Sequence, residues 1–422
     1  MNISELLKPV NCDCGMTHTC DIKNVIIKSG AINEIPDITA DYEHILIVAD
    51  RNTYATCGDK VKELIKDKTE KVFVYDTEEI LVPDEKAVAE FKSQLTDDTD
   101  LIIGIGSGVI QDLCKYVSML AGLKYHIIAT APSMDGYASK GAAMIMGNMK
   151  ITYNARVPEA IIADTDILKN APMDMIKSGY GDILGKFSCL NDWKLSHVVN
   201  DEYLCPYVYD LTFDMLTRTK DLGAKLLARD DEAIKTLMEA LVGVGIAMAY
   251  AGNSRPASGS EHHLSHYFEV VGIMRDEPYF MHGTDVVYSA VYTQRMREAL
   301  LEISEPSEAM PYDYEEWKNN ICKYYDDAAE GVIELQNKLG WYNRDYISIY
   351  RNKWAEICEV LRDTPSSDEL IGYLKTVDLD IKDFDNLYGK DKINSALFFA
   401  KDLKDRYTVL WLYYSLFYKN TK

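Results

Sequence analysis

The 422-residue sequence lacks the features that mark secreted, membrane-spanning and nucleic-acid-binding proteins. No apolar run approaches the roughly 20 residues that cross a bilayer, so we expect no membrane helix. The first residues show no basic segment followed by an apolar core, so we expect no secretory signal. Basic residues are few: 45 Lys and Arg stand against 67 Asp and Glu. The resulting net charge of −22 argues against nucleic acid or an anionic membrane as a partner.

Cysteine is sparse and mostly scattered. The nine cysteines are an odd number, which favours a reduced, cytoplasmic setting over a disulfide framework. The exception is a cluster of Cys12, Cys14, His18 and Cys20. Soft ligands this close together could hold zinc or sense oxidation, although their spacing matches no common structural zinc pattern. A reduced, partly exposed turn is the plainer alternative.

Internal repeats and low-complexity linkers are also missing, and what remains is ordinary globular composition, long enough for two domains. Up to about residue 170, short apolar runs alternate with helical patterns, which predicts a mainly parallel, Rossmann-like α/β sheet. The expected strands are 24–27, 44–50, 71–75, 101–105, 125–130 and 161–163, with a hairpin at 143–145 and 151–153. Beyond this point the pattern is helical. We therefore expect an α/β domain at 1–170 and an all-α domain at 171–422, with the active site in the cleft between them.

The C-terminal third is rich in Tyr and Trp at helical spacing, for example Trp317, Tyr324, Tyr325 and Trp341. This spacing is typical of helix core. The apolar block at 408–418 could also cover a subunit contact, because exposed apolar patches of that size are uncommon on monomers.

A glycine-rich turn, Gly104-Ile-Gly106-Ser107-Gly108, separates an expected buried strand from an expected helix at 109–120. Such a turn permits close backbone approach, and the helix N-terminus offers N–H groups to a phosphate. Alone the signal is weak, because any strand–helix junction can use glycine. Asp112 is expected to pair locally. Asp50 ends another strand, where it either binds an adenosine ribose, which favours NAD over NADP, or is simply solvated.

Four of the eight histidines lie close together, at positions 262, 263, 266 and 282. A helix at 261–271 would place His262, His266 and Glu269 on one face. Two imidazoles need a third, anionic ligand to make an open catalytic metal site. The best candidate is Asp182, which follows a Gly-x-Gly turn and is expected in the first turn of a helix at 182–197. The alternatives are an acidic residue complementing a helix dipole and an ordinary polar helix face.

Two basic residues compete as contacts for a substrate phosphate. Lys186 lies one helical turn from Asp182, but a lysine there could equally pair with Asp182 or extend into water. Arg255 precedes the histidine helix and has the better fork geometry. His197 is expected to be a structural helix residue.

Several segments resemble the bacterial type of sn-glycerol-1-phosphate dehydrogenase. They are, in order, GSGVIQDLCKY, APSMDGYASKGAAM, GYGDILGKFSCLNDWKLSH, SRPASGSEHHLSHYFE and HGTDVV. That family belongs to a superfamily with glycerol dehydrogenase, iron-containing alcohol dehydrogenases and dehydroquinate synthase. The resemblance runs from about Asp50 to about Met296.

The resemblance implies a role for each matching residue. The metal ligands would be Asp182, His262 and His282, and His266 would contact the substrate together with Asp135 and Asp182. The nicotinamide cofactor would be held by Asp50, Gly106, Ser107, Gly108, Val109, Ile110, Thr130, Ser133 and Ser139. For the Ser and Thr residues, turn chemistry is the competing explanation.

The implied reaction is reversible hydride transfer between NAD(H), or NADP(H), and carbon 2 of dihydroxyacetone phosphate, giving sn-glycerol 1-phosphate. One divalent metal would assist, and Asp plus two His suits Zn, Ni and Fe alike. The alternatives are a glycerol or other polyol dehydrogenase, a synthase that recycles NAD like dehydroquinate synthase, and a non-catalytic binding protein. We expect a cytoplasmic homo-oligomer, with a homodimer favoured.

Overall fold

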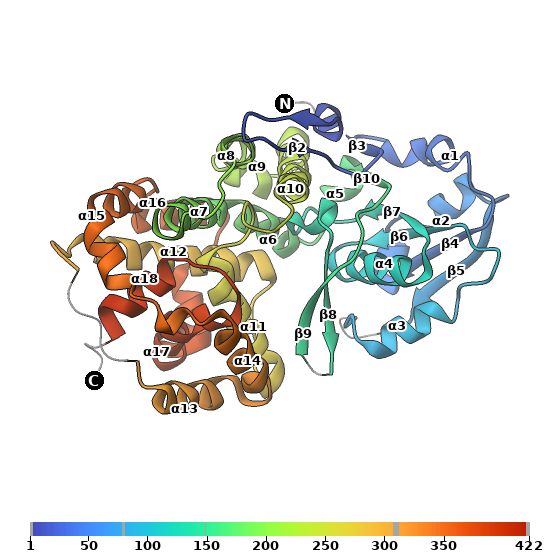
Figure 1. Ribbon diagram of the computed structural model, residues 1–422. Coiled ribbons are helices and arrows are strands. Elements are labelled where there is room, and N and C mark those ends of the chain that lie inside the picture. Colours follow the sequence, from blue (N-terminus) through green and yellow to red (C-terminus); the bar gives the residue numbers. More distant parts are fainter. Residues whose placement is uncertain (1–2, 78–80, 148, 307–311, 419–422) are drawn as a thin grey trace. The chain divides into compact units, whose positions relative to one another are not determined.

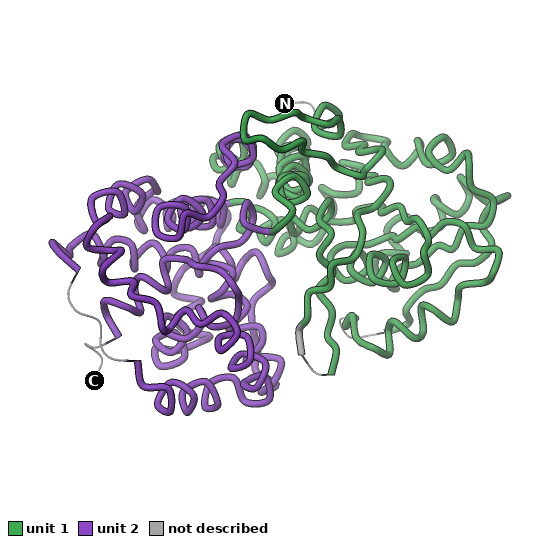
Figure 2. Tube along the Cα trace, viewed as in Figure 1, with its two compact units in different colours: residues 1–183, 217–253 green, residues 184–216, 254–422 purple. Residues whose placement is uncertain are grey.

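The computed structural model describes residues 3–77, 81–147, 149–306 and 312–418 (Figure 1). Figure 2 shows its two compact units. The first unit comprises Met1–Ile183 and Thr217–Asn253, and the second comprises Leu184–Leu216 and Ser254–Lys422. Each unit is built from two segments of the chain. The division into domains at 1–170 and 171–422 stays a prediction.

The first unit is organised around six parallel strands in the order β3-β10-β7-β6-β4-β5. Their bounds are β3 (Asn24–Lys28), β4 (Ile45–Asp50), β5 (Thr69–Tyr75), β6 (Leu101–Gly106), β7 (Lys124–Ala129) and β10 (Ala160–Asp164). Two antiparallel pairs accompany this sheet, β1 (Val10–Asn11) with β2 (Thr17–His18) and β8 (Gly141–Met146) with β9 (Met149–Asn154). The predicted parallel sheet and its hairpin are confirmed.

The helices of the first unit mostly follow strands. They are α1 (Ile35–Ile38), α2 (Arg51–Leu64), α3 (Glu85–Lys92), α4 (Gly108–Ala121), α5 (Thr165–Leu168), α6 (Met173–Leu184), α9 (Gly223–Leu227) and α10 (Asp231–Ala251), with the 3-10 turns η1 (Ile3–Leu7), η2 (Ala31–Glu34) and η3 (Asp135–Ala138). Connections of this βαβ kind place helices on the faces of a parallel sheet.

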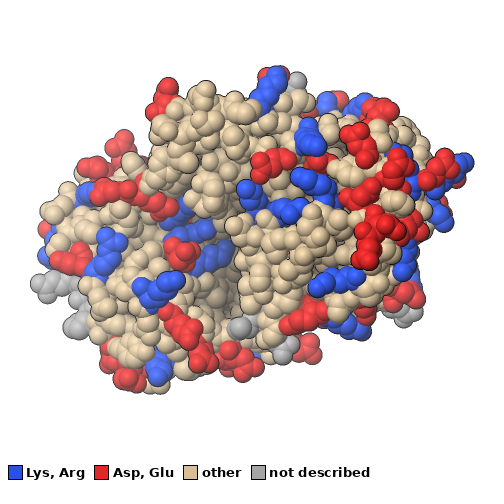
Figure 3. Space-filling model, turned by 45° about the vertical axis from the view of Figure 1, so that its right-hand side comes forward, with Lys and Arg blue, Asp and Glu red and all other residues tan. Residues whose placement is uncertain are grey.

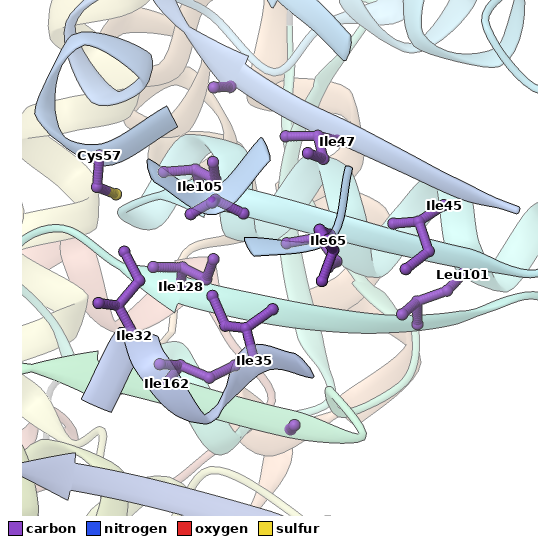
Figure 4. Close-up of a cluster of buried hydrophobic side chains, with 14 of the residues drawn as sticks. Ile32, Ile35, Ile45, Ile47, Cys57, Ile65, Leu101, Ile105, Ile128 and Ile162 are labelled. Atoms are coloured by element: carbon purple, nitrogen blue, oxygen red, sulfur yellow. The ribbon is translucent and has the colours of Figure 1, made fainter. Parts of the chain in front are cut away.

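Alternate residues of the strands face opposite sides of the sheet. On one side, Ile45, Ile47, Ile105 and Ile128 pack with Cys57 of α2 in a continuous apolar cluster (Figure 4). On the other side, β6 presents Gly104 and Gly106, where an added Cβ would lie 2.7 Å from the sulfur of Cys114 and 2.5 Å from Ile110. Glycine at these two positions therefore lets α4 pack closely against the strand.

The strand order creates a switch point between β4 and β6. From β4 the chain moves outward to the edge strand β5, and from β6 it moves the opposite way to β7 and β10. Open α/β sheets bind ligands beyond the carboxyl ends of the two strands at such a point. Here those ends are Asp50 and Gly106, and the register pairs Ala49 with Ile105 just before them.

Among the described residues, one helix, α10, has the length and apolar character of a membrane span. The expectation that no segment reaches this length is therefore wrong. Because 72% of its apolar window is buried inside the protein, α10 has the pattern of a core helix.

The described part of the second unit is helical, as the sequence predicts. Its helices are α7 (Lys186–Asn200), α8 (Pro206–Thr219), α11 (Ser260–Arg275), α12 (His282–Leu301), α13 (Tyr314–Tyr325), α14 (Ala329–Leu339), α15 (Tyr346–Arg362), α16 (Ser367–Lys375), α17 (Ile381–Phe399) and α18 (Val409–Phe417), with η4 (Asp326–Ala328), η5 (Trp341–Asn343) and η6 (Ala400–Leu403). Trp317 and Tyr325 are buried, which confirms their assignment to helix core, whereas Tyr324 and Trp341 are only half-buried. The apolar block of α18 packs inside this unit around Trp411.

Candidate active site

The glycine-rich turn lies at the switch point of the sheet. Gly106 is the last residue of β6, Ser107 precedes α4, and Gly108 begins it. The Ser107 side chain makes no cap hydrogen bond to the helix, and its hydroxyl instead contacts that of Ser133. The first turn of α4, with Val109 and Ile110, therefore presents backbone N–H groups as a helix N-terminus does for phosphates.

Asp50, at the end of β4, has a structural task. Its carboxylate accepts from the backbone N–H of Thr53 at 2.9 Å and caps α2, while the Thr53 hydroxyl accepts from the backbone N–H of Asp50. This reciprocal capping box accounts for an acidic residue here without a ligand. The role of Asp50 toward a ribose stays a prediction.

The loop after β7 carries the other predicted cofactor residues. Thr130 donates its backbone N–H to the carbonyl of Gly106 at 3.1 Å, which ties the two loops together. Ser133 contacts Ser107 as described above. The Ser139 hydroxyl donates to the carbonyl of Gly136 at 3.0 Å and lies 3.4 Å from the ammonium of Lys115. The Ser139 bond is turn chemistry, whereas the contacts of Thr130 and Ser133 join two loops. The cofactor contacts of the three residues stay predictions.

Lys115 of α4 holds this loop through hydrogen bonds to its backbone. Its buried ammonium donates to the carbonyls of Gly136 and Gly141, each at 2.8 Å, and pairs with Asp112 at 3.1 Å. The local pairing expected for Asp112 is confirmed. Sequence reasoning missed Lys115, and its position one helical turn after Asp112 was the available signal.

Asp182 does not open a helix. It lies near the end of α6, and the next helix, α7, begins after a break at Gly185. The expected helix at 182–197 is therefore wrong at its start. The alternative that Asp182 complements the dipole at a helix N-terminus is wrong for the same reason. The Gly-x-Gly segment is helical rather than a turn. Gly179 is required for packing, because an added Cβ would lie 1.9 Å from the carbonyl oxygen of Pro132. That close approach brings the loop over α6, and Asp182 accepts from the backbone N–H of Asp135 at 2.9 Å.

In the second unit three imidazoles converge. His262 and His266 lie one turn apart on α11, and His282 is the first residue of α12. Their ring centroids are 5.1 Å apart for His262 and His282, 5.6 Å for His266 and His282, and 5.9 Å for His262 and His266. The predicted helical face thus exists. Ligand atoms of His266, Glu269 and His282 also lie within 4.8 Å of one another, a second set that could hold a cation.

Glu261, which sequence reasoning missed, fixes the ring of His262. One carboxylate oxygen accepts from Nδ1 of His262 at 2.7 Å and from the backbone N–H of Gly259 at 2.8 Å. Because a carboxylate accepts, Nδ1 carries the proton and the lone pair of the neutral ring is on Nε2, as in metal-binding histidines. Burial raises the pKa of Glu261, opposed by the Gly259 N–H and the nearby Lys186. Its adjacency to His262 was the only sequence signal.

A buried ion pair anchors the start of α11. Asp192 of α7 accepts from the backbone N–H of Ser260 at 2.6 Å and from Arg297 of α12 at 2.9 Å, and both side chains are fully buried. Burial raises the pKa of Asp192, whereas the Arg297 guanidinium opposes this shift. The pair holds α7, α11 and α12 in a fixed arrangement around the histidines.

The two candidates for a substrate phosphate differ in their surroundings. Arg255 is buried, and its guanidinium donates to Glu202, to the carbonyl of Tyr407 and to the hydroxyl of Ser196. Because its guanidinium already donates to these three groups, Arg255 is the weaker candidate for a substrate phosphate. Lys186, the first residue of α7, is also buried. Its ammonium donates to the carbonyl of Ala257 at 3.0 Å, so the side chain does not extend into water.

Two further histidines lie in the same unit. His197 contacts the carbonyl of Glu202 at 2.7 Å, which confirms its expected helix role. His263 is fully buried, and burial, followed by nearby Lys404, Arg406 and Arg255, holds its pKa well below the usual value.

Comparison with known proteins identifies relatives along most of the chain. A family model described as iron-containing alcohol dehydrogenase matches residues 26–172. A glycerol-1-phosphate dehydrogenase [NAD(P)+] of Halalkalibacterium halodurans is 36% identical over 301 residues, covering 68% of this chain and 75% of the relative. One of Geobacillus thermodenitrificans is 30% identical over 342 residues, covering 79% and 84%.

Solved structures share the fold. An archaeal halo-thermophilic alcohol dehydrogenase from a Red Sea brine pool has a TM-score of 0.59 at 14% identity, covering 92% of this chain and 93% of its own. A probable glycerol dehydrogenase from Sinorhizobium meliloti has a TM-score of 0.53 at 17% identity, covering 81% and 98%. At such low identity these likenesses concern the architecture alone.

Proposed function

The chain belongs to the glycerol-1-phosphate dehydrogenase family, and on this premise we propose that its histidine cluster and its switch-point loops together reduce dihydroxyacetone phosphate. The protein is an NAD(P)-dependent oxidoreductase. The product is sn-glycerol 1-phosphate, and the reaction is reversible. The observation that carries the assignment of the site is the convergence of His262, His266 and His282 beside a carboxylate that fixes the tautomer of His262.

Asp182, His262 and His282 are the proposed ligands of one divalent cation. Bound there, the cation would act as a Lewis acid that stabilises negative charge developing on the ketone oxygen. The donor set fits this purpose, since one carboxylate and two imidazoles leave positions for substrate. His262 offers Nε2 because Glu261 holds its Nδ1. Zinc and nickel are the first candidates, and iron fits the same ligands.

The cofactor is assigned to the switch point of the parallel sheet. The N-terminus of α4, from Gly106 to Ile110, would bind the pyrophosphate through backbone N–H groups. Thr130, Ser133 and Ser139 would line the same groove. Asp50 would meet the adenosine ribose with the carboxylate oxygen that does not cap α2, and its charge would disfavour a 2′-phosphate, so NAD is preferred over NADP.

The substrate is assigned to Asp135, Asp182 and His266. His266, which lies one turn from His262 on α11, would pass a proton through water to the new alcohol oxygen. Lys186 is the proposed contact for the substrate phosphate, because Arg255 already serves Glu202. Cytoplasmic location and a homodimer complete the proposal.

The test of the site is His262→Ala, with the exposed His197→Ala as the matched control. Loss of one imidazole ligand should abolish NADH oxidation with dihydroxyacetone phosphate and lower the bound metal, while NADH binding followed by fluorescence stays intact. His197→Ala should behave as the parent. Normal turnover by a folded His262→Ala variant would remove the proposed metal role.

Two rival activities are separated by the same assay. Oxidation of glycerol as efficiently as of sn-glycerol 1-phosphate would favour a polyol dehydrogenase. A synthase that recycles its cofactor would consume no stoichiometric NADH. Absence of both metal and turnover would favour a non-catalytic binding protein.

A further inference from the structure

The N-terminal segment folds into a small ligand-rich hairpin that the dehydrogenase reaction does not use. Between β1 and β2, the backbone N–H of Cys12 donates to the carbonyl of Met16 and that of Gly15 to the carbonyl of Cys12, each at 3.0 Å. Gly15 has φ +87°, a left-handed conformation that favours glycine. The tight reversal brings ligand atoms of Cys12, Cys14 and His18 within 4.8 Å of one another.

His18 is held as metal-binding histidines are held. It is buried, its ring stacks on that of Tyr250 with centroids 5.4 Å apart, and its Nδ1 lies 3.0 Å from the Tyr250 carbonyl. A carbonyl only accepts, so the proton is on Nδ1 and the lone pair of the neutral ring is on Nε2. That nitrogen lies 3.5 Å from Sγ of Cys14. Backbone anchoring of one nitrogen, with the other aimed at the ligands, is the usual support of a metal-bound imidazole.

We propose that Cys12, Cys14 and His18 bind a soft divalent cation, with Zn²⁺ as the expected ion. A tetrahedral zinc with bonds of about 2.3 Å to sulfur and about 2.05 Å to nitrogen separates those two atoms by roughly 3.5 Å, which matches the Cys14–His18 distance. Both thiols lose their protons on binding, and the fourth position is filled by water or a further side chain. The spacing of these ligands in the sequence is unusual for zinc, but the tight turn at Gly15 brings them together in space.

The cation would stabilise the N-terminal hairpin, which is hydrogen-bonded to the last turn of α10. His18 contacts the Tyr250 carbonyl, and the Tyr250 hydroxyl donates to the carbonyl of Leu6. This segment contributes few core side chains, chiefly Ile3, Leu6 and Ile22. A small structure with so little core gains most from a metal.

Cys20 provides a control within the same segment. Like Cys12 and Cys14 it is a cysteine, and it lies two residues after His18, but its sulfur does not belong to the group of ligand atoms. Cys20→Ser is therefore the matched control for Cys12→Ser/Cys14→Ser. Thiolate ligands also distinguish this site from the proposed catalytic one, whose ligands are nitrogen and oxygen only.

The experiment compares metal content and cobalt spectra of the full chain. Purified Cys12→Ser/Cys14→Ser should hold one equivalent of metal less than the parent and than Cys20→Ser. After Co²⁺ replacement, the parent and Cys20→Ser should show thiolate-to-cobalt charge-transfer absorption, and the double variant should not. Turnover with dihydroxyacetone phosphate should be the same in all three, so this outcome is independent of the catalytic assignment.

A measurement on the unaltered protein covers the case in which the double variant does not fold. Titration of the parent with a mercurial thiol reagent, in the presence of a zinc-sensitive dye, should release one equivalent of Zn²⁺ as Cys12 and Cys14 react. No charge-transfer band in the cobalt-loaded parent, or no metal released by the mercurial, would overturn the proposal. Equal metal content in the folded double variant and Cys20→Ser would do the same.

Discussion

At the scale of single residues, the proposed metal chemistry depends on one histidine being held in one tautomer. Glu261 receives the Nδ1 proton of His262 and is itself fixed by the N–H of Gly259. Partners of this kind orient a metal ligand without touching the metal. Glu261 is therefore the proposed positioning residue of His262, and Glu269, on the same helix, belongs to the rival set with His266 and His282.

Glu261→Gln and Glu269→Gln distinguish the two sets. If Asp182, His262 and His282 bind the metal, Glu261→Gln should weaken metal affinity roughly 10- to 100-fold, with activity recovering at high metal concentration, because only the orientation of His262 is lost. Glu269→Gln should leave affinity unchanged. Metal titration with activity as readout measures both. The reverse order of effects would assign the metal to His266, Glu269 and His282.

The same scale shows where sequence reasoning fails. The type and number of the candidate ligands are visible in the chain, whereas the backbone at Asp182 is not. Gly179 and Gly181 suggest a turn, yet both lie inside α6, and Gly179 serves a contact with Pro132, 47 residues earlier in the chain. A glycine that makes room for a distant backbone leaves no local pattern.

Gly179→Ala should destabilise the protein by about 3 kcal/mol, since the carbonyl of Pro132 cannot move without the loop that carries Asp135. Gly372→Ala is the control, because a Cβ there meets open space in α16. It should stabilise by about 0.5–1 kcal/mol through helix propensity. Urea unfolding followed by circular dichroism measures both. Equal effects would show that the Pro132 contact does not limit position 179.

At the scale of elements, the sheet was predictable and the arrangement of helices was not. Strands such as β6 and β7 are short, continuous apolar runs, and runs of this kind read directly as buried strands. Strand order, by contrast, depends on crossover connections that leave no periodicity. The break between α6 and α7 at Gly185 was missed because the apolar pattern continues through it.

The helices around the histidines are held by charge as well as by apolar contact. Asp192 joins α7 to the N-terminus of α11 through Ser260 and to α12 through Arg297, and it also accepts from the backbone N–H of Val409. The guanidinium further donates to Asn191 at 2.8 Å. Because both charges are fully buried, each depends on the other for compensation.

Arg297→Met should therefore cost about 3–5 kcal/mol of unfolding free energy, since it leaves the Asp192 carboxylate buried without its cation. Metal affinity should fall as well, because Ser260, Glu261 and His262 share the first turn of α11. The double variant Asp192→Asn/Arg297→Met should recover part of the stability. A double variant as unstable as the two single losses added together would show that the pair is not coupled.

At the scale of the whole molecule, the two segments of each unit could not be read from the sequence. The segment Thr217–Asn253 rejoins the first unit after an excursion into the second, and nothing in its composition announces this. Net charge, in contrast, is fully given by composition. The face seen in Figure 3 is largely uncharged, with groups of acidic and basic side chains distributed over it.

A net charge of −22 with an isoelectric point near 4.8 predicts a specific salt response. At pH 8 like charges repel in the folded state, and raising NaCl from about 10 to about 150 mM shortens the screening length from roughly 30 to roughly 8 Å, so the melting temperature should rise. At pH 5 the net charge is close to zero, so the same increase in salt should change the melting temperature little. The measurement uses metal-free protein in a chelating buffer, so that metal binding at the histidine cluster does not contribute to the melting temperature. Choline chloride in place of NaCl should give the same rise if screening is the cause, and an equal rise at both pH values would instead indicate binding of a particular ion.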